Sequence, residues 1–547
     1  MLSCWKITPY FPNKYYKNNN KSSSRRLLCR LENSQNQEIV RAKESRKKVL
    51  VVGSGWAGLG AAHHLTKEGY DVTVLEGGIE SGFPSYSSDE VGIQGFWYPY
   101  RNIFSLVDEL GIKPFTSWMK SAQYSEEGLE VEFPVFQDAP QLPTPLAPLT
   151  QTQFARLPML DVLTSIPLMA AVVDFDNTDS AWQKYDPITA RELLRQFGCS
   201  ERLYRSVFDP LLEVRLYAPA EQLSAAATLA VLYYYVAAQQ KNFDMVMCRG
   251  SVRQKIFEPW RGILKNKGCE FRRGRGVTDF FFSEETGCIS EVLCGNDRIK
   301  ADAVILAVGI STLQDIVRRS SALCMKEEFL NVLNLTSIDA LSVKLRLNKK
   351  SILLEVGTMQ INIPKPCNVC SGFDATTGWT FFDLNAIYEE FENDEVTILQ
   401  ADFYHANAFL PLNDEQISAK VMSYLSKCIK DLNGARVVDK EITRYPESFP
   451  HFFPGSYKYS LRGATSFPNL FMAGDWIISR HGSWSQEKSY VTGLEAANRV
   501  VDFLGEGKFA KIIPIDEDEP HIEALRNINR SLNDLRAQLP WSGYFFQ

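Results

Sequence analysis

The chain has 547 residues, too many for one compact core, so two or more domains are expected. Hydrophobic residues make up 45% and charged residues 23%, which is the composition of an ordinary globular protein. The formal net charge of -6 argues against nucleic acid as a partner, because phosphate binding needs concentrated positive charge.

The first residues differ from the rest of the chain in their charge. Up to Leu31 there are seven Lys or Arg, many Ser and Asn, and no acidic residue. The segment lacks the apolar run of a secretory signal, and a basic, hydroxylated start without acids is typical of an organellar transit peptide. We therefore expect residues 1–46 to be a removable segment that directs the protein to the chloroplast. A mitochondrial address and a basic tail without an address are the alternatives.

The next residues predict a dinucleotide-binding unit. Residues 49–52 are an aliphatic run typical of a buried parallel strand, and a helix pattern and a second strand follow, ending at Glu76. Between strand and helix lies the motif Gly53-Ser54-Gly55-Trp56-Ala57-Gly58. Gly53 allows the tight turn, Gly55 lets the backbone approach a pyrophosphate, and Gly58 lets helix and strand pack closely. The helix N-terminus offers free N–H groups to phosphates, and Glu76 is placed to accept hydrogen bonds from ribose hydroxyls.

A second strand followed by Gly-Asp lies near the other end of the chain and favours FAD over NAD. Residues 469–473 read as a buried strand, Gly474 and Asp475 follow it, and a helix pattern runs from about Tyr490 through Gly493 and Leu494. A protein that binds only NAD has no use for this second motif. In flavoenzymes such an Asp accepts bonds from the ribityl chain, and the helix dipole stabilises the negative charge of a reduced flavin.

Four stretches make the sequence similar to the flavin-containing amine oxidase superfamily, and within it to the plant phytoene and ζ-carotene desaturases. They are residues 53–76, 92–102, 300–309 and 446–475. The resemblance implies that Val277 holds the adenine through backbone atoms. It also implies an α/β architecture, the two-dinucleotide-binding-domain flavoprotein fold, with a Rossmann-like FAD domain and an inserted α+β substrate domain.

This resemblance also sets the expected domain boundaries. The FAD domain is discontinuous, and the substrate domain fills the gaps between its parts. The boundaries are 47–115, 240–325 and 465–510 for the FAD domain, 116–239 and 326–464 for the substrate domain, and 511–547 for an acidic, helical tail.

The sequence departs from the family pattern in two places. No basic residue lies between Glu76 and Arg101, where the family carries a Gly-Gly-Arg or Gly-Gly-Lys loop that contacts the pyrophosphate. FAD would lose one charge-assisted hydrogen bond, about 1.5–3 kcal/mol. The second departure is the loop 476–488, whose Arg480, His481 and Trp484 are the candidate catalytic residues, although a lone His on a loop is more often solvated.

These observations predict an FAD-dependent oxidoreductase that passes a hydride from a hydrophobic, carotenoid- or isoprenoid-like substrate to the flavin N5. A flavin amine oxidase and a non-catalytic FAD-fold scaffold or regulator are the alternatives. The sequence does not identify the electron acceptor, for which a quinone and oxygen are the alternatives. No metal site and no transmembrane helix are expected, since the uncharged residues 222–240 include several polar side chains. Peripheral association with a membrane is left open.

Overall fold

The computed structural model describes residues 46–77, 95–144, 146–237, 239–348, 369–371 and 378–537. The expected targeting segment up to residue 45, the start of the 92–102 stretch and the end of the C-terminal tail lie outside these residues. The chain from Lys48 onward forms one unit.

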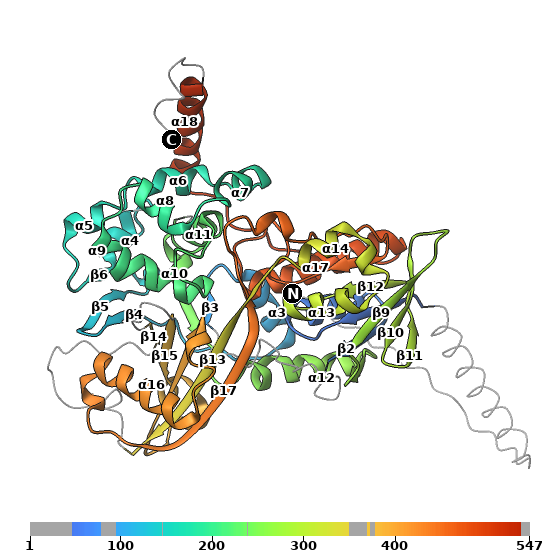
Figure 1. The fold of residues 1–547 in the computed structure, drawn as a ribbon, viewed down its shortest axis with the longest axis horizontal. Coiled ribbons are helices and arrows are strands. Elements are labelled where there is room, and N and C mark those ends of the chain that lie inside the picture. The colour runs from blue at the N-terminus through green and yellow to red at the C-terminus, as the bar shows by residue number, and fades with distance from the viewer. Residues whose placement is uncertain are drawn as a thin grey trace, which may run out of the picture. The chain divides into compact units, whose positions relative to one another are not determined.

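A five-stranded parallel sheet underlies the first part of the fold (Figure 1). Its order is β18 (Leu470–Met472), β12 (Ala303–Leu306), β1 (Lys48–Val52), β2 (Asp71–Glu76) and β8 (Glu270–Arg273), with all neighbours parallel. The central strands are aliphatic along their length because helices cover both faces of such a sheet. The strands predicted at residues 49–52, before Glu76 and at 469–473 are confirmed, and a strand, β12, lies within the 300–309 stretch that carries the family resemblance.

Helices and a smaller sheet surround this parallel sheet. The helices are α2 (Trp56–Lys67), α3 (Arg101–Leu110), α12 (Glu258–Asn266), α13 (Ile310–Arg319), α14 (Glu327–Val332) and α17 (Gln486–Leu504). The smaller sheet is antiparallel and consists of β9 (Val277–Phe282), β10 (Ile289–Cys294) and β11 (Asp297–Lys300). Strands β3 (Gly95–Trp97) and β7 (Met245–Met247) form an antiparallel pair.

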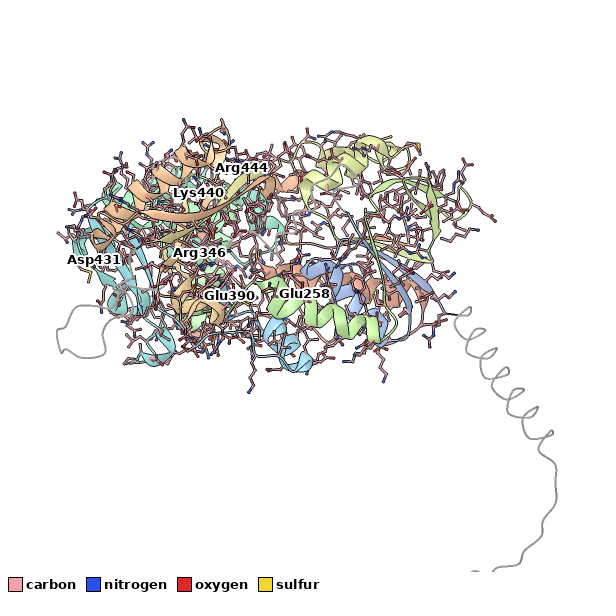
Figure 2. The ribbon with its side chains drawn as sticks, turned by 90° about the horizontal axis from the view of Figure 1, so that it is seen from below. Glu258, Arg346, Glu390, Asp431, Lys440 and Arg444 are labelled. Atoms are coloured by element: carbon pink, nitrogen blue, oxygen red, sulfur yellow. The ribbon has the colours of Figure 1, made fainter. Side chains whose placement is uncertain are left out.

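An eight-stranded, mostly antiparallel sheet forms the other part of the fold. Its order is β17 (Val437–Pro450), β13 (Ser337–Leu347), β16 (Thr397–Tyr404), β15 (Trp379–Asp383), β14 (Val369–Ser371), β4 (Ser121–Ser125), β5 (Gly128–Phe133) and β6 (Gln153–Phe154). Helix α16 (Asp414–Cys428) packs on it, and its first turn pairs with β17. Arg444 contacts Asp414 and Lys440 contacts Glu415, each at 2.8 Å. Figure 2 labels the two basic residues of these pairs, Arg444 and Lys440.

Short helices line the chain between β6 and β7. They are α5 (Met159–Leu163), α6 (Leu168–Asp174), α7 (Asp179–Tyr185), α8 (Ala190–Gln196), α9 (Glu201–Leu203), α10 (Asp209–Leu216) and α11 (Ala225–Leu232). Every residue of α11 is buried, so the uncharged stretch is a core helix. Within the described residues, no helix combines the length and the apolar character needed to span a bilayer.

Helices α2 and α17 pack closely because glycine lies at their contact. A Cβ on Gly493 would come within 2.1 Å of the Ala57 backbone oxygen, and one on Gly60 within 2.8 Å of the Tyr490 ring. Helix α17 also begins four residues earlier than the sequence indicates. Its N-cap is Ser485, whose hydroxyl accepts a hydrogen bond from the Lys488 amide at 3.1 Å.

The start of α17 is tied to α3 and to the C-terminal tail. The Glu487 carboxylate, fully buried, accepts hydrogen bonds from the backbone amides of Asn102 and Ile103 at 2.9 and 3.0 Å. It thereby caps the N-terminus of α3 with a negative charge. The Asn102 side chain also exchanges hydrogen bonds with the backbone of Ile513 at 2.8 and 2.9 Å. The tail then continues into α18 (Pro520–Ala537), which packs against α6.

Candidate functional site

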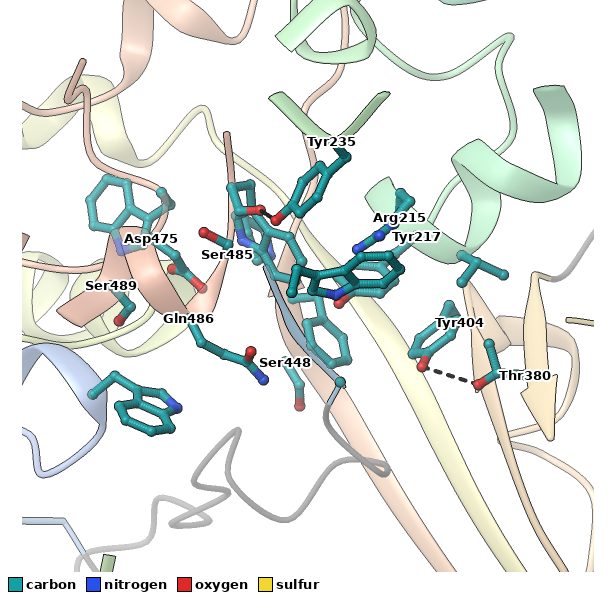
Figure 3. A pocket seen from close by; sticks show the side chains of 18 of the residues that line it. Arg215, Tyr217, Tyr235, Thr380, Tyr404, Ser448, Asp475, Ser485, Gln486 and Ser489 are labelled. Atoms are coloured by element: carbon teal, nitrogen blue, oxygen red, sulfur yellow. Dashed lines mark hydrogen bonds between the residues drawn. The ribbon is translucent and has the colours of Figure 1, made fainter. Parts of the chain in front are cut away.

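A pocket lies where the carboxyl end of the parallel sheet faces the eight-stranded sheet and α10 (Figure 3). On one side it is lined by the start of α2, by the turn after β18 and by the start of α17. On the other side the lining comes from α10, β4, β15, β16 and β17. This is where open parallel sheets bind ligands, outside the carboxyl ends of their strands.

The first motif leaves a helix N-terminus open toward this pocket. Gly53 has φ +104°, and a Cβ on it would come within 2.1 Å of the Ala307 backbone oxygen, so the turn requires glycine. A Cβ on Gly58 would meet the Gly53 backbone oxygen at 2.0 Å. Gly55 caps α2 without any side-chain hydrogen bond, and the first turn holds no acidic residue. With Trp56 and Ala57 it lines the pocket, so the free N–H groups fit a pyrophosphate.

Glu76 lies at the end of β2 between two arginines. Its carboxylate is 2.5 Å from Arg261 Nη2 and accepts a hydrogen bond from Arg273 Nε at 3.0 Å. Arg261 also donates to Ser54 Oγ at 2.8 Å, and its Nε is buried without a hydrogen-bond partner. Arg261 is therefore a half-buried positive charge at the turn of the first motif. Its partners lie far away in sequence, so spacing gave no signal for it.

Val277, the expected adenine contact, is buried at the start of β9. The amide of Arg275, two residues earlier, donates a hydrogen bond to the Glu76 backbone oxygen at 3.1 Å. The start of β9, which carries Val277, therefore lies beside the end of β2, which carries Glu76. Neither residue lines the pocket itself.

The second motif borders the pocket on the same side as the start of α2. Gly474 has φ +147°, and its amide and carbonyl both bond the Thr492 hydroxyl, at 2.9 and 3.0 Å. This fixes the turn, and Asp475 lines the pocket beside it (Figure 3). Gly493 and Leu494 do not line the pocket. They are buried in α17, where Gly493 allows the contact with α2.

Asp475 and Lys488 carry shifted pKa values because both are removed from water. Desolvation raises the pKa of Asp475 to about 6, against the opposing effect of the Lys488 ammonium. Desolvation also lowers the pKa of Lys488 to about 8, again opposed by its partner. The first two turns of α17 thus bring a positive charge toward the turn that carries Asp475.

Of the three candidate catalytic residues, the structure brings one to the pocket. Trp484 lines it and packs edge-on against Tyr217 at a centroid separation of 4.8 Å. His481 is buried with Nε2 3.6 Å from a Glu487 oxygen and does not line the pocket. Arg480 borders a different pocket, and its backbone oxygen accepts a hydrogen bond from Asn177 at 3.2 Å.

An aromatic wall, of which the sequence analysis singled out Trp484 alone, lines the pocket. Its rings come from elements distant in the sequence: Trp97, Tyr217, Tyr235, Tyr404, Phe449 and Trp484. Tyr217 ends α10 with φ +64°, and its ring lies 4.6 Å from Tyr404 and 4.3 Å from Phe449. Arg215, on the same helix end, stacks on Trp97 at 3.3 Å from the guanidinium carbon to the ring centroid.

The arrangement defines a flavoprotein of the two-motif dinucleotide-binding class. An uncapped helix N-terminus, a carboxylate at the second strand end and a Gly-Asp turn surround one end of the parallel sheet. These are the groups that suit the pyrophosphate, ribose and ribityl parts of FAD. Among the described residues, no group of His, Cys, Asp or Glu side chains could hold a metal ion.

Comparison with known proteins identifies the family. The family model for flavin containing amine oxidoreductase matches residues 56–501, and the chain belongs to this family. It is 21% identical to the 15-cis-phytoene desaturase of Synechococcus elongatus, covering 83% of this chain and 96% of that protein. It is also 21% identical to the chloroplastic/chromoplastic zeta-carotene desaturase of Zea mays, covering 82% of this chain and 83% of that protein.

Solved structures share the fold at lower identity. Cyclohexylamine oxidase from Brevibacterium oxydans matches with a TM-score of 0.63 and 14% identity, over 84% of this chain and 100% of that one. Putrescine oxidase bound to putrescine matches with a TM-score of 0.59 and 15% identity, over 84% and 99%. The predicted fold class is confirmed, and the chain is an FAD-dependent oxidoreductase rather than a non-catalytic scaffold.

Asp475 and Lys488 together predict a minimum of stability near neutral pH. Between the ordinary Asp range and about pH 6 the folded state keeps a proton that the unfolded state has released, so stability falls as pH rises. Above about pH 8 the folded state has lost the Lys488 proton that the unfolded state keeps to 10.5, so stability rises again. Each change is expected to be about 1–3 kcal/mol.

Urea unfolding of flavin-free protein across this pH range measures both changes. Asp475→Asn is expected to remove the fall in stability up to about pH 6, and Lys488→Met is expected to remove the rise in stability above about pH 8. Glu415→Gln, which alters an exposed ion pair, should keep both. If the wild type and all three variants showed the same pH dependence of stability, Asp475 and Lys488 would not be the groups that cause it.

Proposed function

We propose that the chain oxidises a large hydrophobic, carotenoid- or isoprenoid-like substrate by hydride transfer to the flavin. The aromatic wall of the pocket is the observation that supports this proposal, because stacked rings bind an extended apolar chain and exclude water. The desaturase relatives, named for phytoene and ζ-carotene, support the same substrate class. FAD, when bound, supplies the hydride acceptor at N5.

The residues on one side of the pocket would then bind the substrate, and those on the other side would bind the flavin. The wall around Tyr217 holds the substrate against the flavin face, and Asp475 with the start of α17 holds the ribityl and pyrimidine parts. A polyene also loses a proton during desaturation. Glu447 lines the pocket and is exposed to solvent, so it offers that proton a path to water.

An amine substrate fits the charges less well. An amine oxidase site needs a place for a cation, and the clustered rings of Tyr217, Tyr404, Phe449 and Trp484 could stack on one. The same region of the pocket already contains the guanidinium of Arg215, which repels a second cation. We therefore propose an isoprenoid-like substrate in preference to an amine.

Anaerobic mixing of the FAD-loaded chain with both substrate classes tests the proposal. Geranylgeraniol, geranylgeranoic acid or ζ-carotene in detergent is expected to bleach the oxidised-flavin absorption band. Putrescine and cyclohexylamine are expected to leave it unchanged. Bleaching by the amines, or by no isoprenoid at all, would refute the substrate class.

For the cofactor itself, we propose that the sequence-predicted residues each hold one part of FAD. Gly53, Ser54, Gly55, Trp56, Ala57 and Gly58 form the pyrophosphate turn, Glu76 binds the ribose, Val277 the adenine, and Gly474 with Asp475 the ribityl chain. Gly493 and Leu494 act through the position of α17. We further propose that Arg261 supplies the positive charge that the missing Gly-Gly-basic loop would provide, because it bonds Ser54 within this turn.

Arg261→Met should then weaken FAD binding by roughly 10- to 150-fold, the loss of one charge-assisted hydrogen bond. Fluorescence titration of flavin-free protein with FAD measures this affinity without relying on turnover. Arg273→Met is the matched control. Arg273 also pairs with Glu76, but its side chain is 70% exposed, so the loss should be several-fold smaller. Equal losses in both variants would contradict the role of Arg261.

We also propose that the mature protein lies in plastids and associates peripherally with a membrane. The basic segment 1–46 and the chloroplastic relatives support the first part. Four apolar side chains exposed on and after α5 support the second: Met159, Leu160, Leu163 and Ile166, with Leu160 79% exposed. Arg202 lies beside this face, bonded to the Arg156 backbone oxygen, and adds positive charge suited to anionic lipid headgroups.

Expression in plant cells tests both parts. Residues 1–46 fused to a fluorescent protein are expected to enter chloroplasts, and the full chain is expected in the plastid membrane fraction. Leu160→Glu should move it to the soluble fraction, whereas Met325→Glu, a change at another exposed apolar residue, should not. Cytosolic fluorescence would refute the targeting. A soluble wild-type chain would refute the membrane contact.

A further inference from the structure

Arg215 places a positive charge inside the aromatic wall. It lies in the last turn of α10, and the helix then ends at Tyr217 in the left-handed conformation. The guanidinium carbon is 3.3 Å from the Trp97 ring centroid and 4.3 Å from that of Tyr235. Figure 3 shows Arg215 beside Tyr217, within the group of side chains that lines the pocket.

The guanidinium has no carboxylate partner in the described part of the chain. No acidic oxygen there lies within ion-pair distance of it, and its Nη2 is buried without a hydrogen-bond partner. Two of the surrounding hydroxyls have hydrogen-bond partners other than Arg215. Tyr235 bonds Tyr100 at 3.0 Å and Tyr404 bonds Thr380 at 3.4 Å (Figure 3).

Such a charge is costly unless an anion joins it. Burial lowers the pKa of Arg215, which shows that its surroundings disfavour the cation. Two stacked rings and the negative end of α10 offset part of the cost. They leave the in-plane donors of the guanidinium unused, and these donors match the two oxygens of a carboxylate.

We propose that Arg215 binds an anionic group of the substrate, so that this oxidoreductase prefers a hydrophobic acid with a carboxylate to the corresponding uncharged molecule. The apolar chain of the acid lies along the aromatic wall, and its carboxylate takes the fork of Nη donors. This rests on the proposed function only for the identity of the pocket as the substrate site. It predicts a binding preference that can be measured without any turnover.

A purely structural role makes the opposite prediction for stability. If Arg215 only stacks between Trp97 and Tyr235, its replacement by Met removes those contacts and lowers the unfolding temperature. If it is held for an anion, Arg215→Met removes an uncompensated charge and leaves the unfolding temperature unchanged or higher. Thermal unfolding of the FAD-loaded variants separates the two.

The decisive measurement is calorimetric titration of the FAD-loaded chain with geranic acid and with geraniol, near neutral pH. The two probes share one isoprenoid chain and differ in carrying a carboxylate or an uncharged hydroxymethyl group. The wild type is expected to bind the acid roughly 10- to 150-fold more tightly than the alcohol, as a charge-assisted hydrogen bond to the half-buried arginine implies.

Three variants complete the experiment. Arg215→Met should bind both probes equally, and Arg215→Lys, which keeps the charge without the fork, should keep part of the preference. Lys also serves as the readout if the Met variant does not fold. Arg205→Met, at an arginine whose side chain is 75% exposed, should keep the full preference.

The outcomes separate this proposal from the proposed function. It is overturned if the wild type binds the acid no more tightly than the alcohol, if neither probe binds, or if the preference survives in Arg215→Met. An Arg215-dependent preference without flavin reduction by any isoprenoid would refute only the redox proposal. Flavin reduction by isoprenoids without the preference would refute only the anion site.

Discussion

The close contact between α2 and α17 is the constraint on which the site depends. The two helices come from opposite ends of the chain, and the start of each lines the pocket. Gly493 and Gly60 allow this approach because a Cβ at either position would meet atoms of the other helix. If the helices stood a few ångströms further apart, Gln486 and Ser489 of α17 would no longer border the same pocket as Gly55 of the first motif.

The features that the sequence predicted share one property, which is that they are local. Each is determined by residues that are adjacent in the sequence, and the structure contains it at the predicted position. Examples are the strand at residues 49–52, the turn at Gly53 and the Gly474-Asp475 turn. The eight-stranded sheet was expected only as part of a substrate domain, because its strand order joins residues far apart in the chain. The start of α17 was placed too late, because the cap at Ser485 lies outside the apolar pattern.

The site residues that sequence reasoning missed are those whose meaning depends on tertiary contacts. Arg261 is one charge on an ordinary amphipathic helix until the fold brings it to Ser54 and Glu76. In the sequence, Arg215 likewise resembles any arginine near the end of a helix. Only the fold shows that its guanidinium stacks on the rings of Trp97 and Tyr235. A chain with net negative charge thus carries a positive side chain at the turn of the first motif (Arg261), one in the first turn of α17 (Lys488) and one in the pocket lining (Arg215). All three are suited to ligands that carry negative charge, namely the cofactor phosphates, a reduced flavin and an acid.

Asn102 gives the C-terminal tail a part in this architecture that its distance from the pocket would not suggest. One side chain bonds both the Glu487 carboxylate and the Ile513 backbone, so it joins the tail to the first turn of α17. Gln486 and Ser489 of that turn line the pocket. Loosening the tail would free Asn102 from one of its two anchors and let the edge of the pocket shift. The tail therefore helps to hold the first turn of α17, and with it one edge of the pocket, in place although it does not line the pocket itself.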